Sequence, residues 1–509
     1  MKILFRAAAV VVAILGVSAA MTSCGGAEGV SQKSAVATAK SMTVGVCEAN
    51  PHYLTYKGEP TLLVTSAEHY GAVLNPAFDY LKYLDQLVKD GMNYTRIFSG
   101  GAYWEGEGDF GITNNTLAPE PGTALVPWAK SDVDGANGGG KKYDLDRWNE
   151  PYFERLHAFV TAAAERDIVV EMTLFTSIYR QESWLRSPFN PTNNINAMTY
   201  DDFLTVHTLA DAKINAYQRR LVERLVEELN DYDNLFFEIQ NEPWADQPVA
   251  RPCTDMWGDK LMARWQSRID LPTEASMDWH EAVAGWIYDK ESTLAKRHLV
   301  AMCYANFACT IHRLPKHVSM VNFHYAWPEA VHLNYGYEMP ICFDESGFSG
   351  KDDATYRQQA WSFLMAGGAM VNNLDYSFAV GHEQGDLIHP APGGGSPALR
   401  SQICALRTWF EEMPFTRMSA DHSVLSLVPG GRGIAFSDHV DLWAIYLYRH
   451  PVPWVQLSLP ADNYEIAWYD PSTAKLLAKE PFQVLADDPF VRLTPPSYTT
   501  DIAARITTR

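Results

Sequence analysis

The sequence predicts an α/β fold in which a (β/α)8 TIM barrel is followed by a small C-terminal all-β sandwich domain. Three observations predict this fold. Eight short apolar runs occur in the first four fifths of the chain, and segments with helical periodicity separate several of them. Most of these runs are continuously apolar, as in parallel strands that helices cover on both sides. From about residue 418 the runs become shorter and often alternate, which is typical of antiparallel strands.

The N-terminal segment predicts an exported protein. A basic start precedes an apolar run over residues 7–20, which is too short for a comfortable membrane span. Small residues then lead to Cys24. Residues 1–23 resemble a bacterial lipoprotein signal peptide, and the resemblance implies that Cys24 becomes the lipidated first residue. Plain secretion or an uncleaved anchor is the alternative. Residues 24–46 are small or polar and predict a tether, so we expect an envelope protein that meets the outer membrane or cell surface only through its lipid.

Residues 47–417 carry the pattern of the barrel. The segment has no phosphate-binding glycine-rich loop after its first apolar run, which argues against a doubly wound nucleotide-binding fold. The predicted strands are Thr61–Glu68, Asn93–Ser99, Ile168–Phe175, Leu235–Asn241, Leu299–Tyr304, Val318–Tyr325, Pro340–Glu345 and Ala369–Ser377. The predicted helices are Phe78–Asp90, Trp148–Arg166, Phe203–Asp231, Glu274–Arg297 and Ala354–Ala366.

Residues 418–509 predict the sandwich. Runs such as Asp441–Tyr448 and Tyr464–Tyr469 are short and are separated by turn residues, for example at Asp470-Pro471-Ser472.

Composition excludes some functions. The chain has 509 residues, of which 47% are apolar, so it can bury a large core. Its net charge is -20, whereas proteins that bind nucleic acids present basic surfaces, so we expect no nucleic-acid partner. Aromatic residues make up 12% of the chain. Their rings either pack against the flat CH faces of sugars or simply fill the core.

Metal and cofactor chemistry has little support in the sequence. There is no HExxH motif, and the histidines are scattered. Residues 131–140 loosely resemble a calcium loop but lack its spacing, so we expect a plain loop. Six cysteines follow Cys24 without CxxC spacing, which leaves buried thiols or one or two disulfides open. We therefore predict neither a metal nor a cofactor.

Two acidic residues follow predicted barrel strands. The fourth run ends in Asn241-Glu242-Pro243, and the seventh ends in Asp344-Glu345. Proline ends a strand because it lacks the amide donor, so Glu242 lies where its strand leaves the barrel. Barrel enzymes place their catalytic groups at that carboxyl end. Either acid alone could be an exposed charge, but two acids at the ends of strands four and seven are much less expected by chance.

This arrangement resembles the clan A retaining glycoside hydrolases, which include family 5. The resemblance implies that Glu242 is the acid/base and that Glu345 is the nucleophile. It also implies that Asn241 supports the substrate and that Arg96, on the second strand, lies near Glu345.

The sixth strand adds His324 and Tyr325, where the resemblance implies a histidine or tyrosine in the site. Because neighbours on a strand face opposite sides, we expect only one of the two to point into the site, and the sequence does not decide which.

Other polar and aromatic residues follow predicted strands and are candidates for binding sugar at the rim. Each could equally fill a loop or pack in the core. They are Glu68, His69, Tyr70, Tyr103, Trp104, Trp244, Trp327, Asp375 and Tyr376.

A second Asn-Glu-Pro motif occurs at Asn149-Glu150-Pro151. No apolar strand precedes it, and a helical pattern follows it. These residue types are common where a helix starts, so we interpret Glu150 as structural.

We therefore predict a retaining glycoside hydrolase that cleaves β-linked bonds of a plant or microbial polysaccharide or oligosaccharide through two glutamates. The C-terminal third is similar to gut-bacterial polysaccharide-degrading barrels with a sandwich tail, such as apiosidase-type glycosidases. The alternative is a non-catalytic surface glycan-binding protein on a degenerate barrel. A sugar lyase or transglycosylase would use the same residues.

Overall fold

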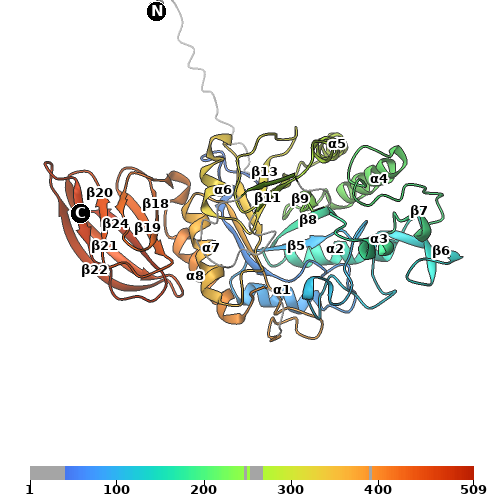
Figure 1. Cartoon of the computed structure of the whole chain (residues 1–509), viewed down its shortest axis with the longest axis horizontal. Helices are drawn as coiled ribbons and strands as arrows, with labels where there is room; N and C mark the ends of the chain where they lie inside the picture. The colour runs from blue at the N-terminus through green and yellow to red at the C-terminus, as the bar shows by residue number, and fades with distance from the viewer. Residues whose placement is uncertain (1–40, 246–248, 253–267, 389–392) are drawn as a thin grey trace, which may run out of the picture. The chain divides into compact units, whose positions relative to one another are not determined.

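The barrel predicted from the sequence is confirmed. The computed structural model describes residues 41–245, 249–252, 268–388 and 393–509 (Figure 1). The eight barrel strands are β4 (Leu63–Ala67), β5 (Tyr94–Phe98), β8 (Val169–Thr176), β9 (Leu235–Asn241), β12 (Val300–Asn306), β13 (Met320–His324), β14 (Ile341–Glu345) and β15 (Met370–Leu374). They form one sheet in the order β4-β15-β14-β13-β12-β9-β8-β5, and every pairing in it is parallel. Each apolar run of the barrel segment therefore became a strand.

Asn93 bridges the two strands at the ends of this order, β4 and β5. The amide of Val64 donates to Oδ1 of Asn93 (2.9 Å), and Nδ2 of Asn93 donates to the carbonyl of Leu62 (2.8 Å). The amide of Asn93 donates to the carbonyl of Val64 (3.3 Å). A side chain thus replaces part of the strand ladder and nearly closes the barrel.

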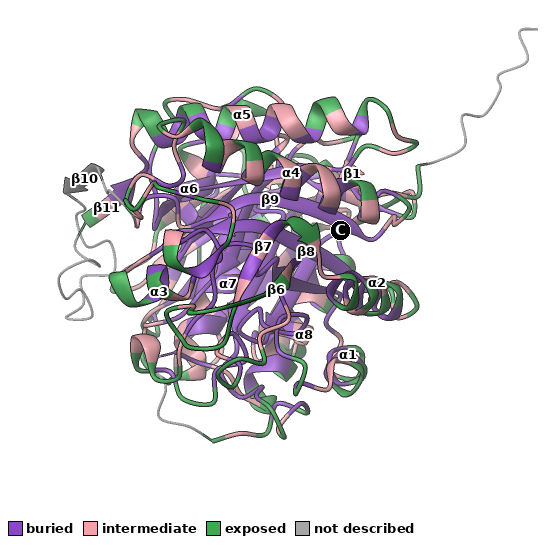
Figure 2. Ribbon diagram, turned by 90° about the vertical axis from the view of Figure 1, so that its right-hand side faces the viewer, coloured by how far each residue is buried: buried purple, intermediate pink, exposed green. Residues whose placement is uncertain are grey.

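Helices cover the outside of the barrel. Their outer faces are exposed and the strands beneath them are buried (Figure 2). Residues 307–319 join β12 to β13 without a helix, which departs from a regular (β/α)8 order. The helices are α1 (Tyr80–Lys89), α2 (Glu150–Ala164), α4 (Ala212–Leu229), α5 (Glu274–Glu291), α6 (Pro328–His332), α7 (Asp353–Met365) and α8 (Pro397–Glu411).

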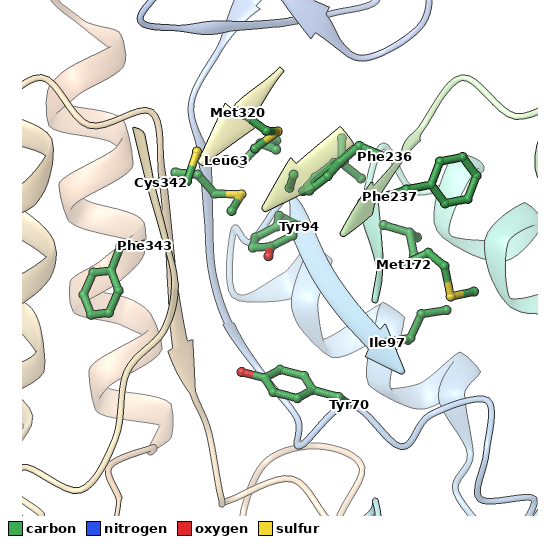
Figure 3. Packing of buried hydrophobic residues seen from close by; sticks show 14 of the residues in the cluster. Leu63, Tyr70, Tyr94, Ile97, Met172, Phe236, Phe237, Met320, Cys342 and Phe343 are labelled. Carbon is green, nitrogen blue, oxygen red and sulfur yellow. The ribbon is translucent and has the colours of Figure 1, made fainter. Parts of the chain in front are cut away.

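The barrel interior is apolar toward the amino ends of the strands and charged toward their carboxyl ends. Tyr94 and Phe236 stack with their ring centroids 6.2 Å apart (Figure 3). Phe343, next to Cys342 in sequence, instead faces outward and packs on Phe363 of α7 at 5.5 Å. Since alternate residues of a strand face the same side, the residues two positions after Tyr94, Phe236 and Cys342 continue the interior toward the rim. All three are charged.

Insertions surround the rim of the barrel. The segment between β5 and α2 carries the short helix η1 (Asp109–Gly111) and the hairpin of β6 (Trp128–Asp134) and β7 (Lys141–Trp148). The segment between β8 and α4 carries α3 (Gln181–Arg186) and η2 (Pro191–Asn193). A second hairpin, β10 (Val249–Pro252) and β11 (Arg268–Leu271), follows β9. The short helix η4 (Tyr335–Tyr337) precedes β14.

A small sheet precedes the barrel. It consists of β1 (Gly45–Val46), β2 (Leu54–Tyr56) and β3 (Glu59–Thr61). The sequence assigned residues 24–46 to a tether, but Thr43 donates a hydrogen bond to Asp233 (2.8 Å) and residues 45–46 form β1. The last residues of the predicted tether are therefore part of the folded protein. The predicted signal peptide and Cys24 lie outside the described residues.

The C-terminal strands form two antiparallel sheets, as predicted. One sheet has the order β16-β18-β19-β24-β21-β22 and the other has the order β17-β20-β23. The short helix η5 (Phe415–Arg417) precedes them. The strands are β16 (Ser419–Ala420), β17 (Leu425–Leu427), β18 (Arg432–Ser437), β19 (Leu442–Tyr448), β20 (Val455–Ser458), β21 (Asp462–Asp470), β22 (Lys475–Val484), β23 (Phe490–Leu493) and β24 (Ile502–Thr508).

The sandwich packs directly on the barrel helices. Arg357 of α7 makes two hydrogen bonds to Asp501, which also accepts one from Tyr446 (2.8 Å). The rings of Trp361 and Tyr446 stack with centroids 5.2 Å apart. A buried ion pair and an aromatic contact therefore join the two parts.

Two further features concern the whole described chain. No disulfide forms among the described residues, because their cysteines are all free thiols: Cys47, Cys303, Cys309, Cys342 and Cys404. No helix among the described residues combines the length and the apolar character that crossing a membrane requires.

Candidate active site

A cavity opens at the carboxyl end of the barrel strands. Its volume of about 280 Å³ lies near the lower end of the range for small-ligand sites, roughly 300–1,000 Å³. It is lined by His69, Phe98, Glu105, Phe110, Ile112, Tyr179, Asn241, Glu242, Trp244, Ala245, Arg268, Asp270, Tyr325, Glu345, Phe348, Leu374 and Tyr376.

Glu242 directly follows β9 on one wall of this cavity. Its backbone has φ 47°, in the left-handed region that non-glycine residues rarely adopt. Its Oε1 accepts a hydrogen bond from the hydroxyl of Tyr325 (2.9 Å) and lies 3.1 Å from Nδ1 of His324. Such strained backbone persists where the surrounding contacts fix it, and it is concentrated at functional sites.

Glu345, the last residue of β14, faces Glu242. Its Oε1 lies 3.1 Å from the hydroxyl of Tyr325, and its Oε2 accepts from Nη1 of Arg96 (3.2 Å). One carboxylate oxygen of Glu242, one of Glu345 and a ring nitrogen of His324 all lie within 4.8 Å of one another. The two acids at the strand ends thus meet in one site.

His324 and Tyr325 both contact this pair, so the expectation that only one of them enters the site is wrong. That expectation treated both residues as part of a regular strand. β13 ends at His324, and Tyr325 has φ 51°, which turns the chain out of the extended conformation. The left-handed residue breaks the alternation and brings both side chains to the same side.

Arg96 lies beneath the two glutamates and is fully buried. Its Nη2 donates to Oδ1 of Asn241 (2.9 Å) and lies 3.2 Å from Asp344, while Nη1 reaches Glu345. It also pairs with Glu238. Arg96 therefore holds both Asn241 and Glu345 in position.

The charged layer around Arg96 was not among the predicted site residues. Glu171, Glu238 and Asp344 are all fully buried, and Asn322 donates to Glu171 (2.7 Å) and Glu238 (3.0 Å). Burial raises the pKa of Glu238 to about 7, although Arg96 opposes the shift. The pKa of Asp344 is lowered to about 2, because Arg96 and His324 outweigh its burial. A charged residue inside an otherwise apolar strand was the signal that could have found all three acids.

The roles assigned to the pair require an ionised Glu345 and a protonated Glu242, but in the unliganded site the two pKa values are shifted in the opposite directions. Burial raises the pKa of Glu345, and the negative Glu242 adds to this effect. For Glu242, hydrogen bonds from His324, Tyr179 and Tyr325 outweigh burial and lower the pKa.

The positive charge that lowers the pKa of Glu242 resides on His324. Burial alone would lower the pKa of this imidazole, but the neighbouring carboxylates of Glu345 and Asp344 raise it well above its ordinary value. The free site therefore carries a protonated histidine next to an ionised Glu242.

Comparisons with known proteins agree with this architecture. No protein-family model matches the chain, and no curated protein sequence matches it. A solved structure described as a glycoside hydrolase aligns with a TM-score of 0.57 and 13% identity, over 92% of this chain and 97% of its own. A glycoside hydrolase family 5 structure from Bacteroides vulgatus gives a TM-score of 0.57 at 13% identity, over 92% and 93% of the two chains. The chain shares the fold of these glycoside hydrolases.

Six of the nine predicted rim residues do not line this cavity, and the side chains of three of them are engaged elsewhere. Glu68 accepts from the amides of Gly71 (3.1 Å) and Ala72 (3.2 Å) and holds its loop. Trp327 is buried against Phe307, with ring centroids 5.3 Å apart. Asp375 accepts from Ser66 (2.7 Å) and Arg400 (2.9 Å). The sequence placed them correctly after strands, but their side chains turn toward loops and helices rather than toward the opening.

Other predicted residues do line the cavity. His69, Trp244 and Tyr376 contribute to its wall, and Trp244 packs edge-on against His324 with centroids 5.5 Å apart. Of the remaining candidates, Tyr70 lies against the guanidinium of Arg96 (4.8 Å). Tyr103 donates to Glu105 (3.2 Å).

Insertions contribute wall residues that the sequence analysis did not single out. Tyr179 accepts from Nδ2 of Asn241 (2.7 Å). Glu105 lies 3.8 Å from Nε2 of His69, and Asp270 pairs with Arg268 at 2.8 Å. Tyr179 follows the third strand, so its position could have found it. Asp270 lies in a hairpin that carried no such signal.

Two groups of side chains place metal-ligand atoms close together. Glu238, Cys303, His324 and Asp344 form one, and Glu242, His324 and Glu345 form the other. Arg96 already supplies positive charge to the carboxylates of the first group, at 3.2 Å from Asp344. In the second group the protonated His324 has the same role, so neither group requires a cation for charge balance.

The second Asn-Glu-Pro motif, Asn149-Glu150-Pro151, is structural, as predicted. Glu150 is the first residue of α2, where its charge favours the helix N-terminus, and it pairs with Arg224 at 3.4 Å.

The loop over residues 131–140 forms the β6–β7 turn. Lys141 donates to the carbonyl of Asp132 (2.7 Å) and to Asp134 (3.2 Å), so its ammonium already engages two of the oxygen atoms that a calcium ion in this loop would need as ligands.

Proposed function

We propose that this protein is a retaining glycoside hydrolase acting on β-linked bonds of a plant or microbial polysaccharide or oligosaccharide. The separation of the two carboxylates is the observation that carries the proposal. The nearest oxygens of Glu242 and Glu345 lie within 4.8 Å. Retaining enzymes keep their carboxyl groups about 5–5.5 Å apart, while inverting enzymes need about 6.5–9.5 Å to admit a water.

In the first step, Glu345 is the nucleophile and Glu242 is the acid. A carboxylate oxygen of Glu345 forms a bond to the anomeric carbon of the sugar. The bond from that carbon to the leaving oxygen breaks, and the leaving oxygen takes the proton of Glu242. Arg96 supports this assignment because it contacts Glu345 at 3.2 Å and offsets its burial.

In the second step, Glu242 acts as the base. It removes a proton from a water molecule as the water oxygen bonds to the anomeric carbon, and the ester bond to Glu345 breaks. Two displacements on the same carbon restore the original configuration. Asn241, held between Arg96 and Tyr179, presents an amide next to the acid/base for a sugar hydroxyl.

His324 supplies the proton that Glu242 needs. In the free site the proton resides on His324, whose Nδ1 is 3.1 Å from Oε1 of Glu242. A neutral sugar that fills the cavity displaces water and raises the cost of keeping both groups charged. Transfer of one proton from His324 to Glu242 removes both charges and prepares the acid for the first step.

We also propose that the protein acts at the cell envelope, anchored through Cys24. The pattern of residues 1–24 supports this location.

One experiment tests the proposed function. The purified protein is incubated with a panel of β-linked polysaccharides and aryl glycosides, and the anomer formed first is followed by NMR. We expect hydrolysis of at least one substrate with retained configuration. Inverted product contradicts the double displacement. Binding to glycans without any hydrolysis supports the non-catalytic alternative, and an unsaturated product supports a lyase.

A further inference from the structure

A second cavity adjoins the candidate active site. Its volume is about 620 Å³, more than twice the 280 Å³ of the first. Glu105 lines both cavities, so the two meet at this residue. The other wall residues come from three segments, over residues 104–124, 130–143 and 185–193, with Asn75, Ala77 and Val380 beside them.

Hydrogen bonds hold these three segments together. The amide of Asn137, in the β6–β7 turn, donates to Oδ1 of Asn193 (2.9 Å), and its side chain donates to Asn190 (3.1 Å). Asp109 accepts from Arg186 (2.6 Å) and from the amide of Gly106 (2.9 Å). The cavity is therefore enclosed by walls that are tied to one another, as a preformed binding site requires.

The wall carries the groups that bind sugars. Trp104 and Tyr143 supply aromatic surface, and Asn114 adds an amide. The ammonium of Lys130 lies 3.2 Å from the ring centroid of Tyr143. Within the described part of the chain, no hydrogen bond or ion pair engages that ammonium, so it is available to donate to a ligand.

The charges of the wall favour a neutral ligand. Glu107 and Glu120 are acidic, and Arg186 is already paired with Asp109 at 2.6 Å. The acids thus outnumber the one unpaired cation, Lys130, and an anionic sugar would meet net repulsion. Hydroxyl groups, by contrast, can donate to the carboxylates and accept from the ammonium.

We infer that the second cavity binds the continuation of the substrate chain, so that the substrate is a neutral glycan of at least three sugar units. This inference rests on the proposed function, because it takes the first cavity as the place of one sugar at the cleaved bond. The second cavity, with more than twice the volume, then has room for two further units. Glu105 lies at the junction, where the chain passes from one cavity to the other.

Glu105 is suited to that position. Its carboxyl accepts from Tyr103 (3.2 Å) and from Asn115. Burial raises the pKa of Glu105 to about 8, so at neutral pH it also offers a proton to a sugar oxygen.

Glycines allow the cavity to be blocked without disturbing the fold. Gly138 lines the second cavity, and a Cβ added there meets nothing within 4 Å. Gly336 is equally open and exposed but lines neither cavity. Gly138→Trp is therefore the blocking variant, and Gly336→Trp is its matched control.

The test measures binding and hydrolysis separately. Binding of β-1,4-linked gluco-, manno- and xylo-oligosaccharides of one to five units is measured by calorimetry on Glu345→Gln protein. Hydrolysis of 4-nitrophenyl β-monoglycosides is measured on protein with Glu345 intact. We expect affinity for one series to rise at least tenfold between one and three units. Gly138→Trp removes this gain, Gly336→Trp keeps it, and both variants leave monoglycoside hydrolysis within about twofold.

The outcomes separate this inference from the proposed function. An affinity that does not rise with length, or that rises equally in Gly138→Trp, overturns the inference even where monoglycosides are hydrolysed. Length-dependent binding that Gly138→Trp removes, without any hydrolysis, supports the second cavity and overturns the proposed function instead.

Discussion

The phenol hydroxyl of Tyr325 lies 3.1 Å from Oε1 of Glu345. The same hydroxyl lies 2.9 Å from Oε1 of Glu242. One hydroxyl proton cannot be donated to two carboxylates at once, so both contacts are favourable only when one of the three groups supplies a further proton. Tyr325 therefore links the two acids and favours the state in which they share a single proton.

Tyr325→Phe removes this link while keeping the ring. A hydrogen bond to a charged group contributes about 1.5–3 kcal/mol, so we expect kcat to fall roughly 10- to 100-fold. The measurement is steady-state hydrolysis of an aryl glycoside. Tyr304→Phe is the control, because its hydroxyl contacts His312 (2.7 Å) outside the cavity. Equal rates in the two variants would show that the phenol does not act on the acids.

The pH dependence of kcat/KM depends on Glu345 and His324. Glu345 must be ionised to attack, and its pKa is raised above 4.5, so activity is lost as the pH falls through a value above 4.5. His324 must be protonated to supply Glu242, and its pKa is raised well above 6.5, so activity is lost as the pH rises through that higher value. We expect a bell-shaped pH profile in which both limbs lie at higher pH than the ordinary pKa values of a glutamate and a histidine would give.

His324→Asn should move the alkaline limb to lower pH, because Glu242 must then hold the proton without a histidine that resupplies it. It should slow substrates with poor leaving groups most, since they depend on the acid. His450→Asn is the control, because residue 450 is exposed on the sandwich. An alkaline limb that is unchanged in His324→Asn would assign the proton to another group.

The fold could be predicted from the sequence because buried strands give a recurring pattern of apolar runs. Strands covered on both faces must be apolar throughout, so Leu235–Asn241 and Ile341–Glu345 were recognisable without any structure. The rim insertions have no such periodicity. The hairpin that carries Asp270 is held by its own pairing and by Asn306, which accepts from the amide of Asp270 (2.8 Å).

The candidate site was predictable where a residue ends a strand and not where the backbone turns. Glu242 and Glu345 follow from position alone. His324 and Tyr325 both point into the site because Tyr325 has a left-handed backbone, with φ 51°. No sequence pattern predicts this conformation. The direction of the pKa shift of Glu242 could not be predicted for a similar reason, because it depends on the distance of 3.1 Å between His324 and Glu242.

Asp501→Ala should destabilise the whole protein. The side chains of Arg357 and Asp501 are 8% and 1% exposed, so removing the acid leaves a buried, unpaired guanidinium. Breaking such a pair costs about 3–5 kcal/mol. The measurement is the midpoint of denaturant unfolding. Glu223→Ala is the control: it breaks the more exposed pair with Arg219 on α4 and should change stability by less than about 1 kcal/mol. A midpoint for Asp501→Ala equal to that of the control would mean that the sandwich does not rely on this pair.

Cys24→Ala should release the protein from membranes. If Cys24 carries the lipid, the variant leaves the detergent phase in phase separation and no longer incorporates a labelled fatty acid. Cys47→Ala is the control, because Cys47 is a buried free thiol of the folded part. An unchanged membrane fraction for Cys24→Ala contradicts lipid anchoring.

Substitutions of the two glutamates should impair hydrolysis in different ways. Glu345→Gln removes the nucleophile, so no glycosyl-enzyme forms and hydrolysis of every substrate is expected to fall by at least about 10⁴-fold. Glu242→Ala removes the acid/base, so substrates with very good leaving groups still react in the first step. Added azide then takes the place of water, because it needs no base, and gives a glycosyl azide of retained configuration.

Glu150→Ala is the control for both, since Glu150 belongs to the same Asn-Glu-Pro motif but begins α2 away from the cavity. Its rates should match those of the unaltered protein. Azide rescue in Glu345→Gln with formation of an azide of retained configuration would exchange the two roles, since retention requires a glycosyl-enzyme on the other glutamate, whereas an anion that replaces a missing nucleophile gives an azide of inverted configuration. Near-normal rates in Glu345→Gln would remove Glu345 from the mechanism altogether, and the short distance between the two carboxylates would then serve binding alone.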